Sequence, residues 1–237
     1  MVVFEGAATD GCFTTQGRFD LPLSGSLVSG LLLCGLLAGA ALADAPPSLD
    51  APDLGRGPFS SMHMLLEKTV LAVDVLTVDV RVDKATQEKI AAIATGKPYS
   101  DELGRQIADL AVKAPNAVVQ LEFKRDVPLN SWMEEVRRNL QQARDAGLIS
   151  AALQQKVSDG LPETFKALKD RGYKKGDRLL YRVKPGSVRT VVVGPDHVTP
   201  FIDTTDTSAD VRTVVMASYM APGSDFRIPL LKSLFGG

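Results

Sequence analysis

Residues 68–83 read KTVLAVDVLTVDVRVD, and this stretch decides the fold class. Between residues 76 and 82, Leu and Val alternate with Thr, Asp and Arg. Alternation with a period of two predicts a strand that buries one face and leaves the other in water. Asp74 shares the parity of the apolar residues, so it points into the buried face unless a bulge turns it away. We therefore expect a long, half-buried strand here.

Four further stretches predict strands. Residues 117–126 alternate in the same way, and Arg125 falls on the apolar parity. Residues 178–184 and 188–193 flank a Pro-Gly-Ser turn and predict an antiparallel hairpin. A further short strand is expected at residues 199–203.

The segments between these strands carry helical patterns. The longest is LNSWMEEVRRNLQQARDAG at residues 129–147, with a cap at Asn130 or Ser131 and an end at Gly147. Trp132 and Asn139 are seven residues apart and share its apolar face. Other helices are expected at residues 85–95, 100–114 (capped by Ser100), 150–158, 162–170 and 208–220, and after Ser224, which can cap the last one.

The order of these elements favours an α+β fold, in which helices cover one face of a large antiparallel sheet. A doubly wound fold is disfavoured because strands and helices do not alternate regularly. No glycine-rich phosphate loop follows a strand either.

The N-terminal region is expected to be a signal peptide, residues 1–43. Leu27 to Ala43 is uncharged and ends in Ala-Leu-Ala before Asp-Ala-Pro-Pro. A membrane anchor is the alternative, although three glycines interrupt a run at or below spanning length. Three acids and one arginine precede the run, which suggests that translation starts downstream of Met1. Cys34 follows a leucine in mid-run, so a lipoprotein signal is rejected.

Cleavage after Ala43 predicts a periplasmic or secreted chain, with a linker or arm at residues 44–58 and one domain at 59–237. Both cysteines are lost with the signal peptide, and 26 Lys and Arg then face 25 Asp and Glu. This near-neutral charge argues against nucleic acid as a partner. No later run is long enough to span a membrane, and the oligomeric state stays open.

Few residues suggest catalysis or metal binding. A Ser-His-Asp triad would need His63 or His197, and both are more simply solvated. Metal-ligand spacings are missing, so neither a metal nor another cofactor is expected. Three clustered acids, Asp203, Asp206 and Asp210, are explained more simply by the start of a helix.

Asn139 and Arg125 are polar residues on apolar faces, so each needs a partner or a ligand. Asn139 either bonds a neighbouring backbone group or lines a cleft between helix and sheet. Arg125 either extends to solvent, pairs with Asp126 or Asp74, or holds a ligand. Trp132, the only tryptophan, either packs in the core or forms a wall of a pocket.

The chain resembles the chalcone isomerase-like superfamily, as a bacterial member, over roughly residues 62–235. The resemblance rests on EKTVLAVDVLTVDV, NSWMEEVRRN, GDRLLYRVKPGSVRTVVV and APGSDFRIPLLKSLF in that order. It implies a large antiparallel sheet covered by helices, with a cleft between them. Members of the superfamily include plant isomerases that close a chalcone to a flavanone, fatty-acid-binding proteins and non-catalytic relatives.

The enzymes of that superfamily use an Arg, a Thr, and a Tyr and an Asn on one helix. Here the resemblance places Asn139 at the Asn and Trp132 at the Tyr. Val73 stands near the Thr, and Ser61 stands near the Arg. Three of these four polar groups are therefore missing, which argues against flavonoid cyclisation.

Three hypotheses follow. The first is a binding protein for a fatty acid or similar amphipathic ligand, with ligand contacts from Trp132, Asn139, Val73, Asp74 and Arg125. The second is an intramolecular lyase or isomerase that uses Asn139 with Asp74 or Arg125. The third is a structural or interaction protein of the cell envelope whose cleft is collapsed and filled.

Overall fold

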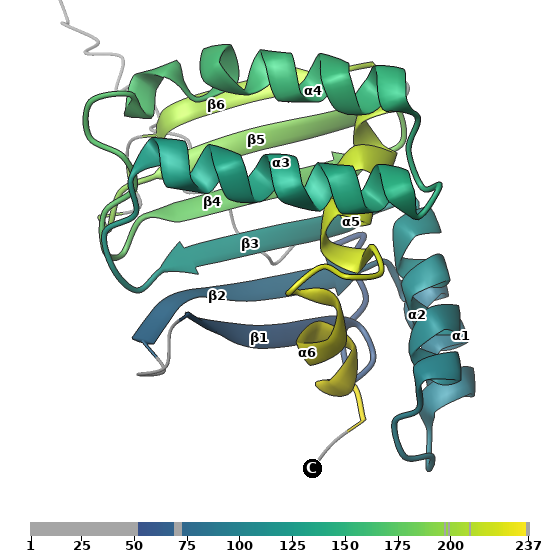
Figure 1. The fold of residues 1–237 in the computed structure, drawn as a ribbon. Helices are drawn as coiled ribbons and strands as arrows, with labels where there is room; N and C mark the ends of the chain where they lie inside the picture. The colour runs from purple at the N-terminus through teal and green to yellow at the C-terminus, as the bar shows by residue number, and fades with distance from the viewer. Residues whose placement is uncertain (1–51, 69–72, 197, 199, 209, 236–237) are drawn as a thin grey trace, which may run out of the picture. The chain divides into compact units, whose positions relative to one another are not determined.

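The computed structural model describes residues 52–68, 73–196, 198, 200–208 and 210–235. The expected signal peptide and His197 lie outside these residues. Six strands form one sheet in the order β1 to β6, and each strand pairs antiparallel with its neighbour in sequence (Figure 1). The strands are β1 Ser61–Lys68, β2 Val73–Val82, β3 Ala117–Phe123, β4 Arg178–Lys184, β5 Ser187–Val193 and β6 Pro200–Asp206. The predicted α+β class, with a large antiparallel sheet, is confirmed.

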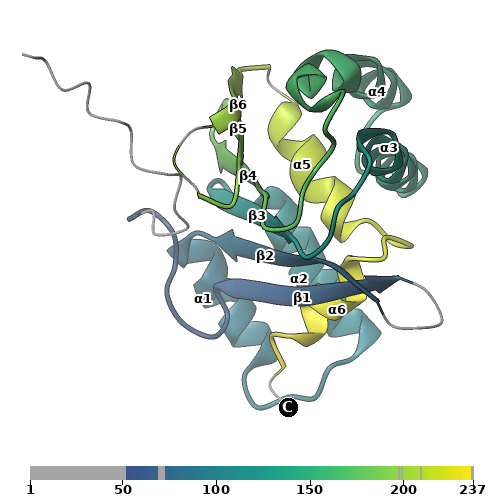
Figure 2. The same cartoon turned by 90° about the vertical axis from the view of Figure 1, so that its left-hand side faces the viewer.

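Helices α3, α4 and α5 lie on the same side of this sheet (Figure 2). The α-helices are α1 Lys84–Ala94, α2 Asp101–Lys113, α3 Leu129–Asp145, α4 Ala151–Thr164, α5 Val211–Met220 and α6 Arg227–Lys232; a 3₁₀ turn, η1, spans Lys166–Leu168. Helix α5 packs against α2, α3, β4 and β5, so it lies centrally in the helical layer. In the described part of the chain, no helix combines the length and the apolar character needed to cross a bilayer.

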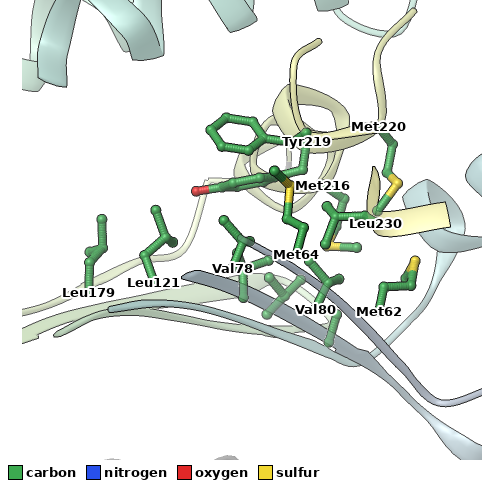
Figure 3. Close-up of a cluster of buried hydrophobic side chains, with 14 of the residues drawn as sticks. Met62, Met64, Val78, Val80, Leu121, Leu179, Met216, Tyr219, Met220 and Leu230 are labelled. Carbon is green, nitrogen blue, oxygen red and sulfur yellow. The ribbon is translucent and has the colours of Figure 1, made fainter. Parts of the chain in front are cut away.

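The apolar parity of β2 points into the core, as its sequence predicts. Leu76, Val78 and Val80 are buried and pair with Phe123, Leu121 and Val119 of β3. Methionines from β1 and α5 pack over them (Figure 3): Met62, Met64, Met216 and Met220. Flexible thioethers fill irregular gaps well, so the core beneath β1–β3 is filled.

Strand β1 is missing from the sequence-based prediction. Its sequence, SMHMLLEK, alternates with Met62, Met64 and Leu66 inward and His63 and Leu65 outward. Met and Leu are not enriched in strands. The alternation of β1 therefore indicates a strand, but its residue types do not. Pairing with β2 supplies the stabilisation that local propensity does not.

The predicted ends of two helices are confirmed. Ser100 caps α2, since its Oγ accepts a hydrogen bond of 3.3 Å from the Leu103 N–H. Gly147 follows α3 with a φ of 71°, a left-handed conformation that glycine adopts without steric cost.

Two other predicted caps are wrong. Asn130 and Ser131 lie inside α3, because Pro128 occupies the capping position and no side-chain bond caps the helix. Ser224 lies before α6, where Phe226 holds the capping position without a side-chain bond. The Ser224 hydroxyl instead accepts the N–H of Phe226 at 3.3 Å and lies 3.4 Å from the Asn139 amide oxygen.

The two helices expected at residues 150–170 are one helix, α4, followed by η1. Pro162 lies within α4, near its end. A proline removes only one backbone hydrogen bond at that point, so the helix continues to Thr164 before it stops.

The opposite face of the sheet is polar and is crossed by the described part of the N-terminal arm. Leu54 packs there against Val118 and Leu180. Arg182 pairs with Asp53, so the arm is held by a charged contact as well as by an apolar one. The arm therefore covers part of this face, on the side of the sheet opposite helices α3, α4 and α5.

Candidate ligand cavity

A cavity of about 920 Å³ lies between the helices and the β4–β6 half of the sheet. Apolar side chains from every surrounding element line it: Trp132, Val136 and Leu140 of α3; Leu153, Val157 and Leu161 of α4; Val188 and Ile202 of the sheet; and Val211, Val214 and Val215 of α5. Small-molecule sites usually have volumes of about 300–1,000 Å³, so this cavity is at the upper end of that range.

Two strands form much of the sheet side of the cavity. Val188 and Thr190 of β5 face the helices, and Ile202 of β6 lies beside them on the same face. The cavity is partly open to solvent, and its volume is within the range of small-molecule sites.

Trp132 forms one end of this cavity within an aromatic cluster. Phe123 and Tyr173 stack with ring centroids 4.0 Å apart, and Trp132 meets both edge-on at 5.6 and 5.7 Å. These contacts hold the indole in place with only 4% of Trp132 exposed. Its Nε1–H has no hydrogen-bond partner in the described part of the chain. A buried donor without a partner costs free energy, and a ligand can recover it.

Two tyrosines that the sequence analysis did not single out, Tyr181 and Tyr219, also line the cavity. Tyr181 lies on the core face of β4 between Val119 and Thr190. Burial raises the pKa of Tyr181, and burial together with the nearby Tyr181 phenol raises the pKa of Tyr219. Both hydroxyls are therefore neutral donors at physiological pH.

Figure 3 shows how the Tyr219 side chain lies. Its hydroxyl points away from the methionine side chains and over Leu121 and Leu179 of the sheet. Tyr181 follows Leu179 by two residues, so it lies on the same face of β4. The two phenols therefore face the same region of the cavity.

Asn139 lies in the cavity wall as well, with 4% of its surface exposed. Its amide Nδ2 lies 3.4 Å from Glu135 Oε1, and its Oδ1 lies 3.4 Å from Ser224 Oγ. The expected alternatives were a backbone partner or a place in a cleft. The structure shows a cleft position with two long side-chain bonds and, among the described residues, no bond from the amide to a backbone group.

Charged residues line only the exposed parts of the cavity. They are Lys156, Glu163, Lys166, Asp203 and Asp206. Lys166 Nζ pairs with Glu163 Oε1 at 2.5 Å, and Asp203 is held by two hydrogen bonds from Arg189 at 2.6 and 2.7 Å. The interior therefore contains no cation among the described lining residues.

Of the remaining predicted site residues, only Arg125 has a described side chain, and it does not line the cavity with Trp132 and Asn139. Arg125 lies beyond the end of β3, is exposed, and is not among the residues that line the cavity. Its apolar parity has no consequence because the strand stops at Phe123. Val73 and Asp74 lie in β2, and their side chains are outside the described part.

The two other groups considered for chemistry are also separate. His63 bonds Asp79 at 2.7 Å, and Ser233 Oγ contacts the His63 backbone N–H, so its imidazole has no serine partner. Asp203 and Asp206 lie in β6 and do not start a helix, which corrects the prediction for them. Asp210 precedes α5 without a side-chain bond. Within the described residues, no group of three His, Cys, Asp or Glu could hold a metal ion.

The chain shows a structural likeness to a plant protein. No family model and no curated protein matches the sequence. Among solved structures, the chain is similar to a fatty-acid binding protein from Arabidopsis thaliana, with 13% sequence identity and a TM-score of 0.48. The likeness covers 73% of this chain and 86% of the plant chain.

Proposed function

We propose that this protein is a chalcone isomerase-like binding protein that holds a fatty acid or a similar small amphipathic molecule in the cavity between sheet and helices. The observation that carries the proposal is the cavity of about 920 Å³. Apolar side chains form most of its lining surface, and the donors of Trp132, Tyr181 and Tyr219 lie among them. An open cavity also distinguishes this function from a structural protein with a filled cleft.

The walls suit an aliphatic chain. Each methylene group that leaves water contributes about 0.8 kcal/mol, so ten of them contribute roughly 8 kcal/mol before the cost of association. Part of this is lost to immobilising the ligand, and an affinity in the micromolar range follows. The polar donors add orientation more than affinity, because they exchange bonds with water for bonds with the ligand.

Trp132 provides a direct test, since it is the only tryptophan and lines the cavity. Titration with decanoic to hexadecanoic acid is expected to change Trp132 emission with saturation at one equivalent and a Kd of about 1–50 μM. Affinity should rise with chain length as more methylene groups are buried. Short acids such as butyric acid serve as the control and should leave the emission unchanged. An emission that responds to no chain length would contradict the proposal.

We also propose that the chain is exported and begins at Asp44 after cleavage. The support is the uncharged run that ends in Ala41-Leu42-Ala43. Intact-mass and N-terminal analysis of the protein expressed from its full gene should give Asp44 as the first residue, and the protein should fractionate outside the cytoplasm. Ala43→Arg should block cleavage, because small residues are required there. A cytoplasmic, uncleaved wild-type chain would refute export.

A further inference from the structure

The donors inside the cavity come from neutral side chains. Trp132 Nε1–H can only donate, and it has no partner among the described residues. No hydrogen bond joins the Tyr181 or Tyr219 hydroxyl to any described group either. Trp132, Tyr181 and Tyr219 are therefore lining side chains whose N–H or O–H group has no acceptor among the described residues.

The charged side chains that line the cavity lie at its exposed parts, away from these donors. Its charged lining residues are all exposed, and three of them are acids against two lysines. One lysine, Lys166, already pairs with Glu163. No excess of positive charge therefore compensates a buried anion, and burying an uncompensated carboxylate is costly.

The pKa shifts of the two tyrosines also indicate that the interior disfavours negative charge. Burial raises the pKa of both Tyr181 and Tyr219, which means that the environment disfavours negative charge. The same environment would raise the pKa of a carboxylic acid placed beside them. The protonated, uncharged form of an acid is therefore favoured there over the carboxylate.

We infer that the cavity selects aliphatic chains with an uncharged carbonyl head group, whose oxygen accepts hydrogen bonds from Tyr181 and Tyr219, with Trp132 Nε1–H as a third donor. This inference rests on the proposed function and names its ligand class more narrowly. Ketones, esters, aldehydes and protonated fatty acids share the required group. Permanently charged head groups either lack a carbonyl oxygen or bring a charge that the interior does not compensate.

Four ten-carbon probes with different heads test the inference: decan-2-one, decane, decane-1-sulfonate and decyltrimethylammonium. Calorimetry at pH 7 is expected to show decan-2-one binding at least tenfold more tightly than either charged probe. The affinity of decanoic acid should fall as pH rises from 5 to 8, because the protonated fraction falls, whereas that of decan-2-one should stay constant. Sulfonate binding as tight as that of the ketone would overturn the inference.

The variants Tyr181→Phe and Tyr219→Phe assign the head group to its donors. Each removes one hydroxyl and keeps the ring, so each is expected to lower the affinity for decan-2-one about five- to tenfold. Decane, which has no acceptor, should bind with unchanged affinity, a result that a general packing defect would not give. Tyr99→Phe lies outside the cavity and is the matched control.

The outcomes separate the two proposals. Binding of sulfonate or decanoate without discrimination, and without an effect of either variant, overturns the uncharged head group and leaves a lipid-binding cavity. If none of the probes or longer acids binds, the binding function itself is wrong. Tight ketone binding that Tyr181→Phe and Tyr219→Phe weaken, with decane unaffected, supports both.

Discussion

Thr190→Phe is expected to abolish ligand binding and to leave the fold intact. Thr190 lies on the core face of β5, opposite Tyr181 in the β4–β5 pair, and lines the cavity. A phenyl ring there occupies the space that the ligand needs. We expect the Kd for hexadecanoic acid to rise at least 30-fold, which corresponds to about 2 kcal/mol. Stability should be unchanged or higher by up to about 1 kcal/mol, because a filled cavity adds packing contacts.

The matched control is Thr77→Phe, which makes the same exchange on the opposite face of the sheet. That variant should bind the acid as the wild type does. Titration of Trp132 emission gives the affinity, and urea unfolding gives the stability. If Thr190→Phe binds with wild-type affinity, the ligand does not occupy the space beside β5.

Phe123→Ala is expected to be the most destabilising single change discussed for this chain. Phe123 is fully buried, stacks on Tyr173 and meets the edge of Trp132. Its removal leaves a void in a packed cluster, which typically costs about 3–5 kcal/mol. The variant should therefore unfold at a much lower urea concentration, with Trp132 emission shifted to the red as the indole becomes solvated.

Phe235→Ala is the control, because Phe235 is half-buried and contacts only the edge of Tyr99 among the aromatic rings. A loss of about 1 kcal/mol is expected there. Far-ultraviolet circular dichroism and Trp132 emission should give the same midpoint for each protein, so that the two-state treatment applies. A loss below about 1.5 kcal/mol for Phe123→Ala would mean that the aromatic cluster does not stabilise the cavity end as described.

The sequence was sufficient for five of the six strands, all but β1, and for one wall of the cavity. The period of two in β2, β3 and the hairpin predicts which face is buried. The spacing of seven in α3 predicts that Trp132 and Asn139 share a face, and both line the cavity. These features were predictable because they depend on local periodicity alone.

The cavity itself was not predictable in the same way. Alternation in a strand predicts which side chains face the helical layer. It does not predict whether the helices fill the space above those side chains. Tyr181 illustrates the difference, since it shares the inward parity of Leu179 and Val183 yet lines the cavity. A tyrosine among inward aliphatic residues is the one signal that could have identified it. Tyr219 depends on how α5 crosses β4 and β5, which only tertiary packing sets.

Native mass spectrometry of the protein recovered from cells tests the central claim most directly. The account predicts a complex with one bound molecule of lipid mass in the purified protein, or uptake of one molecule of added long-chain acid or ketone. It also predicts that Thr190→Phe stays empty under both conditions, whereas Thr77→Phe is loaded like the wild type. A wild-type protein that is always empty and takes up no offered chain would contradict the account.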